Sequence, residues 1–421
     1  MNADDIRRLR REPATAAAWL REPSLREVWK NPSPSTARVL LSIYSRPDHF
    51  DLAPELRHML QHELTRVGYP VVSGPPSSRA ERLDWLRSMR EENVLEKDVV
   101  LERLLSRAGR EDAEVLIGVI DTGLNPYLPQ LQGKLAPEGE SNGEQVHGRD
   151  FSGAGNVFGS QLDDANHGNH VTGVATKGSH RIKSAFCRIS FEKGDATPPV
   201  SQQVVDSIEH LASKGARVIN ISFHVSASHV APIAEAMKRH PEILFVVSAA
   251  NNNKGGEDLA EVVGSDPNQL LATCDVPNKV VVASVTPEGE RAHSSNYGKS
   301  HVTHAMRGKQ VLSFGRGEEL MFDSGTSMAT PHVTHAVANM LLFVPELGVS
   351  EQIELLNASV ERDDTWESLV QSEGIVSLRR SQELAALVQV MRAGTAGPEA
   401  ARKLGISKGA AELVELASRH S

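Results

Sequence analysis

Short apolar runs and longer amphipathic stretches alternate through the middle of the chain. Residues 115–120, 217–222, 243–248 and 279–284 are four such apolar runs, each bounded by turn residues. The stretches between them, 201–215 for example, carry apolar residues at the spacing of a helix. Strands that are apolar on both faces and alternate with helices are typical of a parallel sheet between two helical layers. The pattern predicts an α/β, doubly wound domain with a mostly parallel sheet and helices on both faces.

The two ends of the chain have a different pattern. Residues 1–110 are rich in Arg, Leu and Glu, and their apolar residues show helical spacing interrupted by a Pro-rich stretch. After about residue 385 the spacing becomes helical again. We therefore expect three regions: a mostly helical accessory or regulatory region over 1–110, the α/β domain over 111–385, and a helical C-terminal extension over 386–421.

Composition and charge narrow the classes of partner. A chain of 421 residues with 39% hydrophobic content is long enough to bury a large core. The formal charge is -9, from 45 basic against 54 acidic residues, and no block of like charge stands out. We therefore expect neither nucleic acid nor an anionic membrane as a partner.

The cysteines and the start of the chain bear on its location. Cys187 and Cys274 are the only cysteines, and both lie in largely apolar surroundings, which favours buried thiols over a disulfide framework. The first dozen residues carry charges throughout, and no apolar run approaches the roughly 18 residues that a membrane-spanning helix needs. We expect a soluble, cytoplasmic protein.

A turn rich in Gly, Ser and Thr runs directly into a helix-like apolar pattern at residues 323–341, and Ser327 stands at the start of that helix. One interpretation is an ordinary Ser/Thr cap before a buried helix. The other is a nucleophile exposed at the mouth of the helix. That second interpretation requires a base and a carboxylate from elsewhere in the chain.

Candidates for both groups occur earlier in the sequence. Asp121 lies one residue past a predicted buried strand, where an open parallel sheet gathers functional groups, although an Asp before Gly also caps turns. His167 and His170 are three residues apart, a spacing that would suit a metal site if a third ligand were close. Alternatively, His167 is a general base. The order Asp121, His167, Ser327 is one of the orders in which a catalytic triad is built.

Three blocks of the sequence resemble a known family. "VIDTGLN", "NHGNHVTG" and "GTSMATPHV" are similar to the signature blocks of the subtilisin-like serine proteases, the subtilases. The resemblance covers roughly residues 113–385. It implies a serine endopeptidase that hydrolyses peptide bonds through an acyl-enzyme, with Asp121 as the orienting carboxylate, His167 as the general base and Ser327 as the nucleophile. We expect Pro331 in the first turn of the helix, where a missing N–H matters little.

A fourth, weaker block concerns the oxyanion hole. "ILFVVSAANNN" resembles the family segment in which a strand ends in Ala-Ala-Gly-Asn and the asparagine donates to the oxyanion. The resemblance places Asn252 on that asparagine. A polar turn residue after a strand is the alternative interpretation of Asn252.

Two departures from the family pattern affect the substrate pocket. Asn251 replaces the glycine before the oxyanion asparagine, and "SFHV" replaces Ser-Leu-Gly-Gly. The resemblance makes Ser222, Phe223, His224 and Asn251 substrate-binding residues. Side chains in place of glycine hydrogens should narrow or reshape the pocket, so we expect restricted specificity.

A third departure concerns metal ions. Residues 174–190 run almost directly from the histidine block into the next apolar segment. Many secreted subtilases carry a calcium-binding loop there, so the resemblance implies no calcium at that position. We expect neither a metal nor a cofactor, which also suits an intracellular enzyme.

Two further questions concern function beyond catalysis. The altered pocket leaves open a catalytically silent subtilase scaffold that acts as a protein-binding module. Residues 1–110 could be a cleaved pro-segment, but their helical spacing differs from the alternating strands of such segments. We expect a retained region that regulates access or binds a regulatory protein partner, beside the protein or peptide substrate.

Overall fold

The computed structural model describes residues 97–421 except 142–143, 158–163, 193–196, 264–268, 316–319 and 408. Nearly all of them belong to one compact unit, which comprises 93–319 and 323–421. The predicted accessory region 1–110 lies outside the described residues up to residue 96. Its last part forms helix α8, which Asp98 caps by accepting hydrogen bonds from the backbone N–H groups of Val100 and Leu101.

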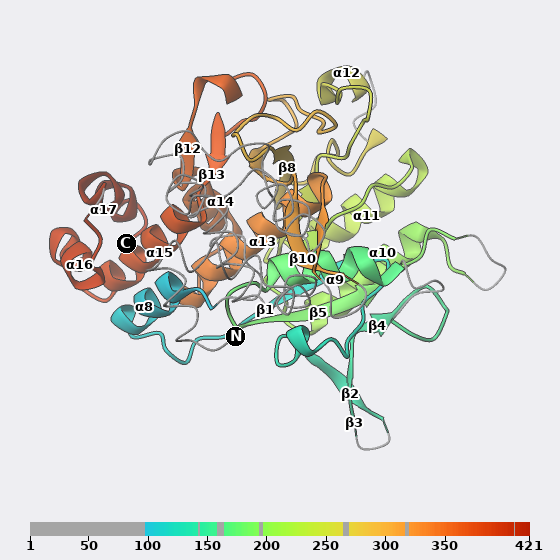
Figure 1. Cartoon of the computed structure of the whole chain (residues 1–421), viewed down its shortest axis with the longest axis horizontal. Helices are drawn as coiled ribbons and strands as arrows, with labels where there is room; N and C mark the ends of the chain where they lie inside the picture. The colour runs from blue at the N-terminus through green and yellow to red at the C-terminus, as the bar shows by residue number, and fades with distance from the viewer. Residues whose placement is uncertain are drawn as a thin grey trace, which may run out of the picture. The chain divides into compact units, whose positions relative to one another are not determined.

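A nine-stranded sheet forms the centre of the domain (Figure 1), in the order β12-β13-β9-β8-β7-β6-β1-β5-β4. All neighbouring strands run parallel except the edge pair β12 and β13. The strands of this sheet are β1 (Val115–Asp121), β4 (Arg149–Asp150), β5 (Ile182–Arg188), β6 (Val218–Ile221), β7 (Leu244–Ser248), β8 (Lys279–Val285), β9 (His304–Arg307), β12 (Val360–Arg362) and β13 (Gly374–Val376). The four apolar runs of the sequence are therefore β1, β6, β7 and β8.

Helices and short strands surround this sheet. The helices are α8 (Val99–Ala108), η2 (Pro129–Leu131), α9 (Asp164–Ala175), α10 (Val200–Ser213), α11 (Ala227–Arg239), α12 (Leu259–Val263), α13 (Thr326–Phe343), α14 (Val349–Ala358), η4 (Asp364–Trp366), α15 (Leu378–Arg392), α16 (Gly397–Leu404) and α17 (Ala410–Ser418). The remaining strands are β2 (Pro137–Ser141), β3 (Glu144–His147), β10 (Val311–Phe314) and β11 (Leu320–Asp323). Among the described residues, no helix has the length and apolar character to cross a membrane.

The side chains of β6 show that helices cover both faces of the sheet. Ile219 and Ile221 belong to one buried cluster with apolar residues of α10 and α11. Asn220, which points to the opposite face because side chains alternate along a strand, binds Thr334 of α13. Helix α9 packs beside α13 on that face. The predicted doubly wound α/β fold is confirmed.

Helix α13 lies in the interior, and every residue in it except Ser327 is buried. A helix that is buried all round explains why its sequence lacks a polar face. Helix α15 packs against α13 and also against α8 and α17, as Figure 1 shows near the C-terminus. Arg107 of α8 donates to the carbonyl oxygen of Leu404 at 2.8 Å. The boundary predicted at residue 385 falls inside α15.

Candidate active site

The ends of β1 and β6 bring two polar residues together. β1 ends at Asp121, and Ser222 directly follows the last residue of β6. The two strands are parallel neighbours whose register pairs Ile120 with Ile221. If this pairing is continued by one residue, the backbone of Asp121 lies beside the backbone of Ser222. The two are then separated by about 5 Å, the spacing of neighbouring strands. Both residues therefore lie at the carboxyl edge of the sheet, where open α/β folds gather functional groups.

Asp121 holds the imidazole of His167. Nδ1 of His167 lies 2.8 Å from Oδ1 and 3.0 Å from Oδ2 of the carboxylate. Asp121 is 1% exposed, and the backbone N–H of Thr122 donates to its Oδ1 at 2.8 Å. Burial acts to lower the pKa of His167, but the charge of Asp121, its hydrogen bond and the charge of Asp323 raise that pKa above its ordinary value. Because Nδ1 donates to the carboxylate, Nε2 is the nitrogen left to take up a proton.

Gly168 allows α9 to approach the loop after β1. A Cβ added at Gly168 would lie 1.8 Å from the carbonyl oxygen of Gly123 and 3.0 Å from the ring of Phe186. Any side chain there would push α9 away from β1. The glycine therefore explains how His167, one residue earlier, reaches Asp121.

His170 points into the protein, away from this carboxylate. It is 0% exposed, and its Nε2 donates to the carbonyl oxygen of Val311 at 2.9 Å. The two histidines of the block therefore do not share a ligand site. Among the described residues, no group of three or more His, Cys, Asp or Glu side chains is placed to hold a metal ion.

The hydroxyl of Ser327 is bound to the segment that follows β6. Its Oγ donates to the carbonyl oxygen of Ser222 at 2.7 Å, and Oγ of Ser222 donates in return to the carbonyl oxygen of Ser327 at 2.9 Å. Ser222 lies beside Asp121 in the sheet register, and Asp121 holds His167. The hydroxyl and the imidazole are thus anchored at neighbouring strand ends.

Pro331 does not lie in the first turn of α13, so that prediction was wrong. The helix begins at Thr326, which places Pro331 in the second turn. A proline there removes the backbone N–H that would bind the carbonyl of Ser327 four residues earlier. The hydroxyl of Ser222 satisfies that carbonyl instead. The proline therefore frees the Ser327 carbonyl for a bond to the sheet.

A buried chain of hydrogen bonds extends this contact into the core. Oγ1 of Thr334 donates to Oδ1 of Asn220 at 3.0 Å, and Nδ2 of Asn220 donates to Oγ of Ser222 at 2.9 Å. The Ser222 residue is 1% exposed. The buried Ser222 side chain therefore fixes the start of α13, and the substrate-binding role expected of this residue stays a prediction.

The structure places Asn251, rather than Asn252, beside the start of α13. Oδ1 of Asn252 accepts the backbone N–H of Lys254 at 2.9 Å, so this side chain closes a turn. Oδ1 of Asn251 accepts the backbone N–H of Thr326 at 3.1 Å, next to Ser327. Ala250 adopts a left-handed conformation with φ 64°, directly before Asn251. Asn251, expected to bind substrate, therefore replaces Asn252 beside α13.

Two nitrogen donors border one small space at the start of α13. A Cβ added at Gly325 would lie 3.4 Å from Nδ2 of Asn251 and 3.8 Å from the backbone N of Ser327. Because Oδ1 of Asn251 accepts from Thr326, its Nδ2 is left to donate. A side-chain amide and a backbone N–H at a helix N-terminus are donors that stabilise a developing negative charge.

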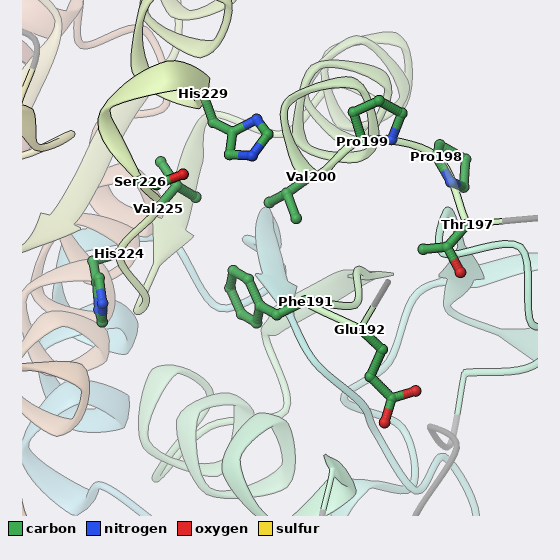
Figure 2. A pocket seen from close by; sticks show the side chains of 10 residues that line it. All are labelled: Phe191, Glu192, Thr197, Pro198, Pro199, Val200, His224, Val225, Ser226 and His229. Atoms are coloured by element: carbon green, nitrogen blue, oxygen red, sulfur yellow. The ribbon is translucent and has the colours of Figure 1, made fainter. Parts of the chain in front are cut away.

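A cavity of about 590 Å³ lies beside the segment that follows Ser222. Its lining residues are Phe191, Glu192, Thr197, Pro198, Pro199, Val200, His224, Val225, Ser226 and His229. Figure 2 shows the side chains of Phe191 and Val200 directed toward each other and the carboxylate of Glu192 directed away. Phe191 and Val200 therefore give one part of the cavity an apolar surface.

Two of the residues expected to bind substrate bear on this cavity. His224 is exposed and lines it, and its role in binding substrate stays a prediction. Phe223 packs edge-on against the ring of Phe191, with centroids 5.6 Å apart. Phe223 therefore supports one wall of the cavity.

Three residues of this site were not among the candidates predicted from the sequence. Asn220 and Thr334 are buried and link the sheet to α13, and Phe191 forms a cavity wall. A signal existed for Asn220, since it is a polar residue inside an apolar run and a buried amide needs partners. Phe191 had no such signal, because it follows β5 in a segment without periodicity.

Comparison with known proteins extends these observations. A model of the subtilase family matches residues 112–372. The chain is 28% identical over 273 residues to the cell wall-associated protease of Bacillus subtilis (strain 168), covering 63% of this chain and 27% of that protein. It is 28% identical over 232 residues to the thermophilic serine proteinase of Bacillus sp. (strain AK1), covering 53% of this chain and 51% of that protein. The chain thus spans about a quarter to a half of these relatives' lengths.

Solved structures share the fold at lower sequence identity. The subtilase cytotoxin structure superimposes with a TM-score of 0.56 at 17% identity, covering 71% of this chain and 98% of that chain. A lanthipeptide protease gives a TM-score of 0.55 at 17% identity, covering 74% and 100%. These two structures show the fold, and the family model, which matches more than half of the chain, shows that the chain belongs to the subtilase family.

Proposed function

We propose that this protein is a serine endopeptidase that hydrolyses peptide bonds through an acyl-enzyme. The observation that carries the proposal is that His167 pairs with buried Asp121 at the end of β1, while Ser327 is hydrogen-bonded at the end of the neighbouring strand, β6. In the reaction, Nε2 of His167 takes the proton of the Ser327 hydroxyl as its oxygen attacks the carbonyl carbon. Asp121 stabilises the imidazolium, which then gives the proton to the leaving amine. Water repeats the sequence to release the acyl group.

We further propose that Nδ2 of Asn251 and the backbone N–H of Ser327 bind the oxyanion. Both border the space at Gly325, and the positive end of α13 faces the same space. These donors are held before the reaction begins, so they stabilise the tetrahedral intermediate without reorganising.

A fluorophosphonate probe tests the proposal directly. We expect it to label the purified protein, and peptide mapping should place the label on Ser327. One observation favours the alternative of a catalytically silent scaffold. The Ser327 hydroxyl donates its hydrogen bond to the carbonyl oxygen of Ser222 rather than to the imidazole of His167. Absence of labelling at every pH at which the protein stays folded would support that scaffold and contradict the endopeptidase.

Asn251→Ala is expected to reduce turnover strongly, whereas Asn252→Ala is expected to leave it nearly unchanged. The loss for Asn251→Ala should be about 10² to 10³ in kcat, a magnitude that belongs to subtilisin itself. Asn252→Ala removes only the hydrogen bond that closes its turn, which should cost about 1 kcal/mol of stability. Steady-state kinetics on both variants, with urea unfolding as the stability control, decide the assignment. Equal kcat for wild type and Asn251→Ala would return the role to Asn252.

We propose that specificity is restricted by the cavity beside His224, one part of which is apolar. The cavity adjoins the segment that follows Ser222, so a substrate bound at Ser327 passes close to it. Phe191 and Val200 direct apolar surface into it. A large apolar side chain on the acyl side of the scissile bond should fill this space.

Val200→Trp should fill the cavity and change peptide preference. We expect kcat/KM for peptides with a bulky apolar side chain at that position to fall about 10- to 100-fold, since burying such a side chain contributes about 1.5–3 kcal/mol. The same peptide with alanine there should keep its kcat/KM, which controls for damage to the catalytic groups. If Val200→Trp lowered kcat/KM equally for all peptides of a library, the assignment of the cavity as the substrate pocket would be contradicted.

We propose that residues 1–110 stay attached and regulate access or bind a partner protein. Support comes from α8, whose Leu101, Leu104 and Leu105 are 0% exposed, and from the bond of Arg107 to Leu404. A cut between 105 and 115 would separate a helix that is packed into the domain. Intact-mass measurement of an active preparation should find Met1 or Asn2 as its first residue. Quantitative cleavage between 105 and 115, blocked by Ser327→Ala, would instead indicate a pro-segment.

We also propose a cytoplasmic location. The support is that Cys187 and Cys274 are free, buried thiols, as is usual in a reducing compartment. Fractionation of cells that express the full chain tests this, and recovery outside the cytoplasm would contradict it.

A further inference from the structure

A buried arginine is the neighbour of Asp121 in the register of the sheet. Arg188 ends β5, and the parallel register of β1 and β5 pairs it with Asp121. Arg188 is 1% exposed and is one of the largest fully buried side chains of the described residues. Burying a charged guanidinium costs free energy unless the group is ion-paired and hydrogen-bonded.

The guanidinium contacts the loop after β1 on one side and a second loop on the other. Nε donates to the carbonyl oxygen of Thr122 at 3.0 Å. Nη1 donates to Oδ1 of Asp150 at 3.1 Å, to Oγ of Ser152 at 2.6 Å and to the carbonyl oxygen of Asn156 at 3.4 Å. Asp150 supplies the compensating charge, and it too is buried. The arginine therefore joins the Thr122 backbone to the end of β4 and the loop that follows it.

Thr122 is the residue that orients the catalytic carboxylate. Its backbone N–H donates to Oδ1 of Asp121 at 2.8 Å, and its hydroxyl lies 3.3 Å from the same oxygen. The next carbonyl, that of Gly123, contacts α9 at Gly168. The Thr122–Gly123 segment is thus held between Arg188 and the helix that carries His167.

We propose that Arg188 is a positioning residue, which fixes the Thr122 peptide so that Asp121 meets Nδ1 of His167 in one geometry. The proposal rests on the proposed function for its kinetic consequence, but its geometric content concerns only the Asp121–His167 pair. Without the guanidinium, the Thr122 carbonyl loses the hydrogen bond from Nε of Arg188, and the Asp121 carboxylate is held less firmly. The imidazolium would then be less stabilised, both in the resting enzyme and during proton transfer.

The pKa of His167 separates three roles for Arg188. If Arg188 positions Asp121, Arg188→Met weakens the ion pair and the pKa of His167 falls. If Arg188 acted only through its charge, loss of a nearby cation would raise that pKa. If it served only to stabilise the fold, the pKa would stay where it is in the folded variant. The direction of the shift therefore decides between the roles.

The experiment compares wild type, Arg188→Met, Arg188→Lys and the control Arg217→Met. Arg217 also donates hydrogen bonds to backbone carbonyl oxygens, those of Pro345 and Leu347. It lies at the amino end of β6, whereas the candidate active site lies at the carboxyl ends of the strands. NMR titration of the His167 ring gives its pKa whether or not the protein is active. We expect a lower pKa in both Arg188 variants and no change in Arg217→Met.

Kinetics supply the second measurement. We expect kcat to fall about 10- to 100-fold in Arg188→Met with KM within about 3-fold, because a small misplacement of a catalytic group costs that much. The acid limb of the kcat profile should move to lower pH, since the base then stays neutral to lower pH. Arg188→Lys keeps a buried charge for Asp150 but cannot bind Asp150 and Thr122 together, so it should fold and show the same shift.

The outcomes are distinguishable from failure of the proposed function. A raised or unchanged His167 pKa in folded Arg188→Lys, or its full kcat, would overturn the positioning role. If wild type neither hydrolyses peptides nor takes the fluorophosphonate label, the endopeptidase proposal fails, while a lowered pKa in the Arg188 variants would still establish the positioning role.

Discussion

Ser327→Ala is expected to abolish peptide hydrolysis and fluorophosphonate labelling while the protein stays folded. The loss should be about 10⁶ in kcat, a magnitude that belongs to subtilisin, a member of the same family, rather than one obtained from this structure. The fold should survive because the described contact of this hydroxyl is one hydrogen bond to the carbonyl of Ser222, worth about 1 kcal/mol. Peptide hydrolysis and circular dichroism measure the two effects.

Ser324→Ala is the matched control for this change. Ser324 lies three residues earlier, is exposed, and accepts the backbone N–H of Gln310 at 3.0 Å. Loss of the Ser324 hydroxyl should leave kcat within about 2-fold of wild type, since a substitution at an exposed position disturbs the structure little. Turnover retained by Ser327→Ala, or lost equally in Ser324→Ala, would show that Ser327 is not the nucleophile.

His167→Ala should be as damaging as Ser327→Ala. In subtilisin, removing the base costs about as much as removing the nucleophile, about 10⁶ in kcat, because the groups act as a unit. The His167 side chain is 33% exposed and its described bonds go only to Asp121, so the free energy of unfolding should change little. Kinetics paired with urea unfolding test both statements.

His170→Ala serves as the comparison, and its effect should be the reverse. Its imidazole is fully buried and donates to the carbonyl of Val311. Removing it leaves a cavity and an unpaired carbonyl, which together should lower the free energy of unfolding by about 2–4 kcal/mol. The kcat of the folded fraction should stay within about 10-fold. A stable but inactive His170→Ala beside an active His167→Ala would mean that the two histidines have exchanged roles.

The amino-acid sequence by itself determined the fold class and the identity of the triad candidates. Apolar runs such as 115–120 and 243–248 alternate with amphipathic helical stretches, which is the pattern of a parallel sheet between two helical layers. The family and its fold were likewise predictable, because the blocks around Asp121, His167 and Ser327 are local in sequence. Each block specifies a short backbone segment and its chemistry, so no long-range contact is needed to recognise it.

The tertiary structure alone decided which asparagine lies beside Ser327. Three consecutive asparagines give the sequence no way to choose, and the choice depends on the left-handed conformation of Ala250, which alanine does not favour intrinsically. The structure also decided the roles of Ser222 and Arg188. Each binds residues far away in the chain, at Ser327 and at Thr122, and such pairings arise only when β1, β5 and β6 become neighbours in the sheet. Local sequence patterns cannot predict these hydrogen bonds, because bonds between distant segments depend on strand register and packing rather than on residue type.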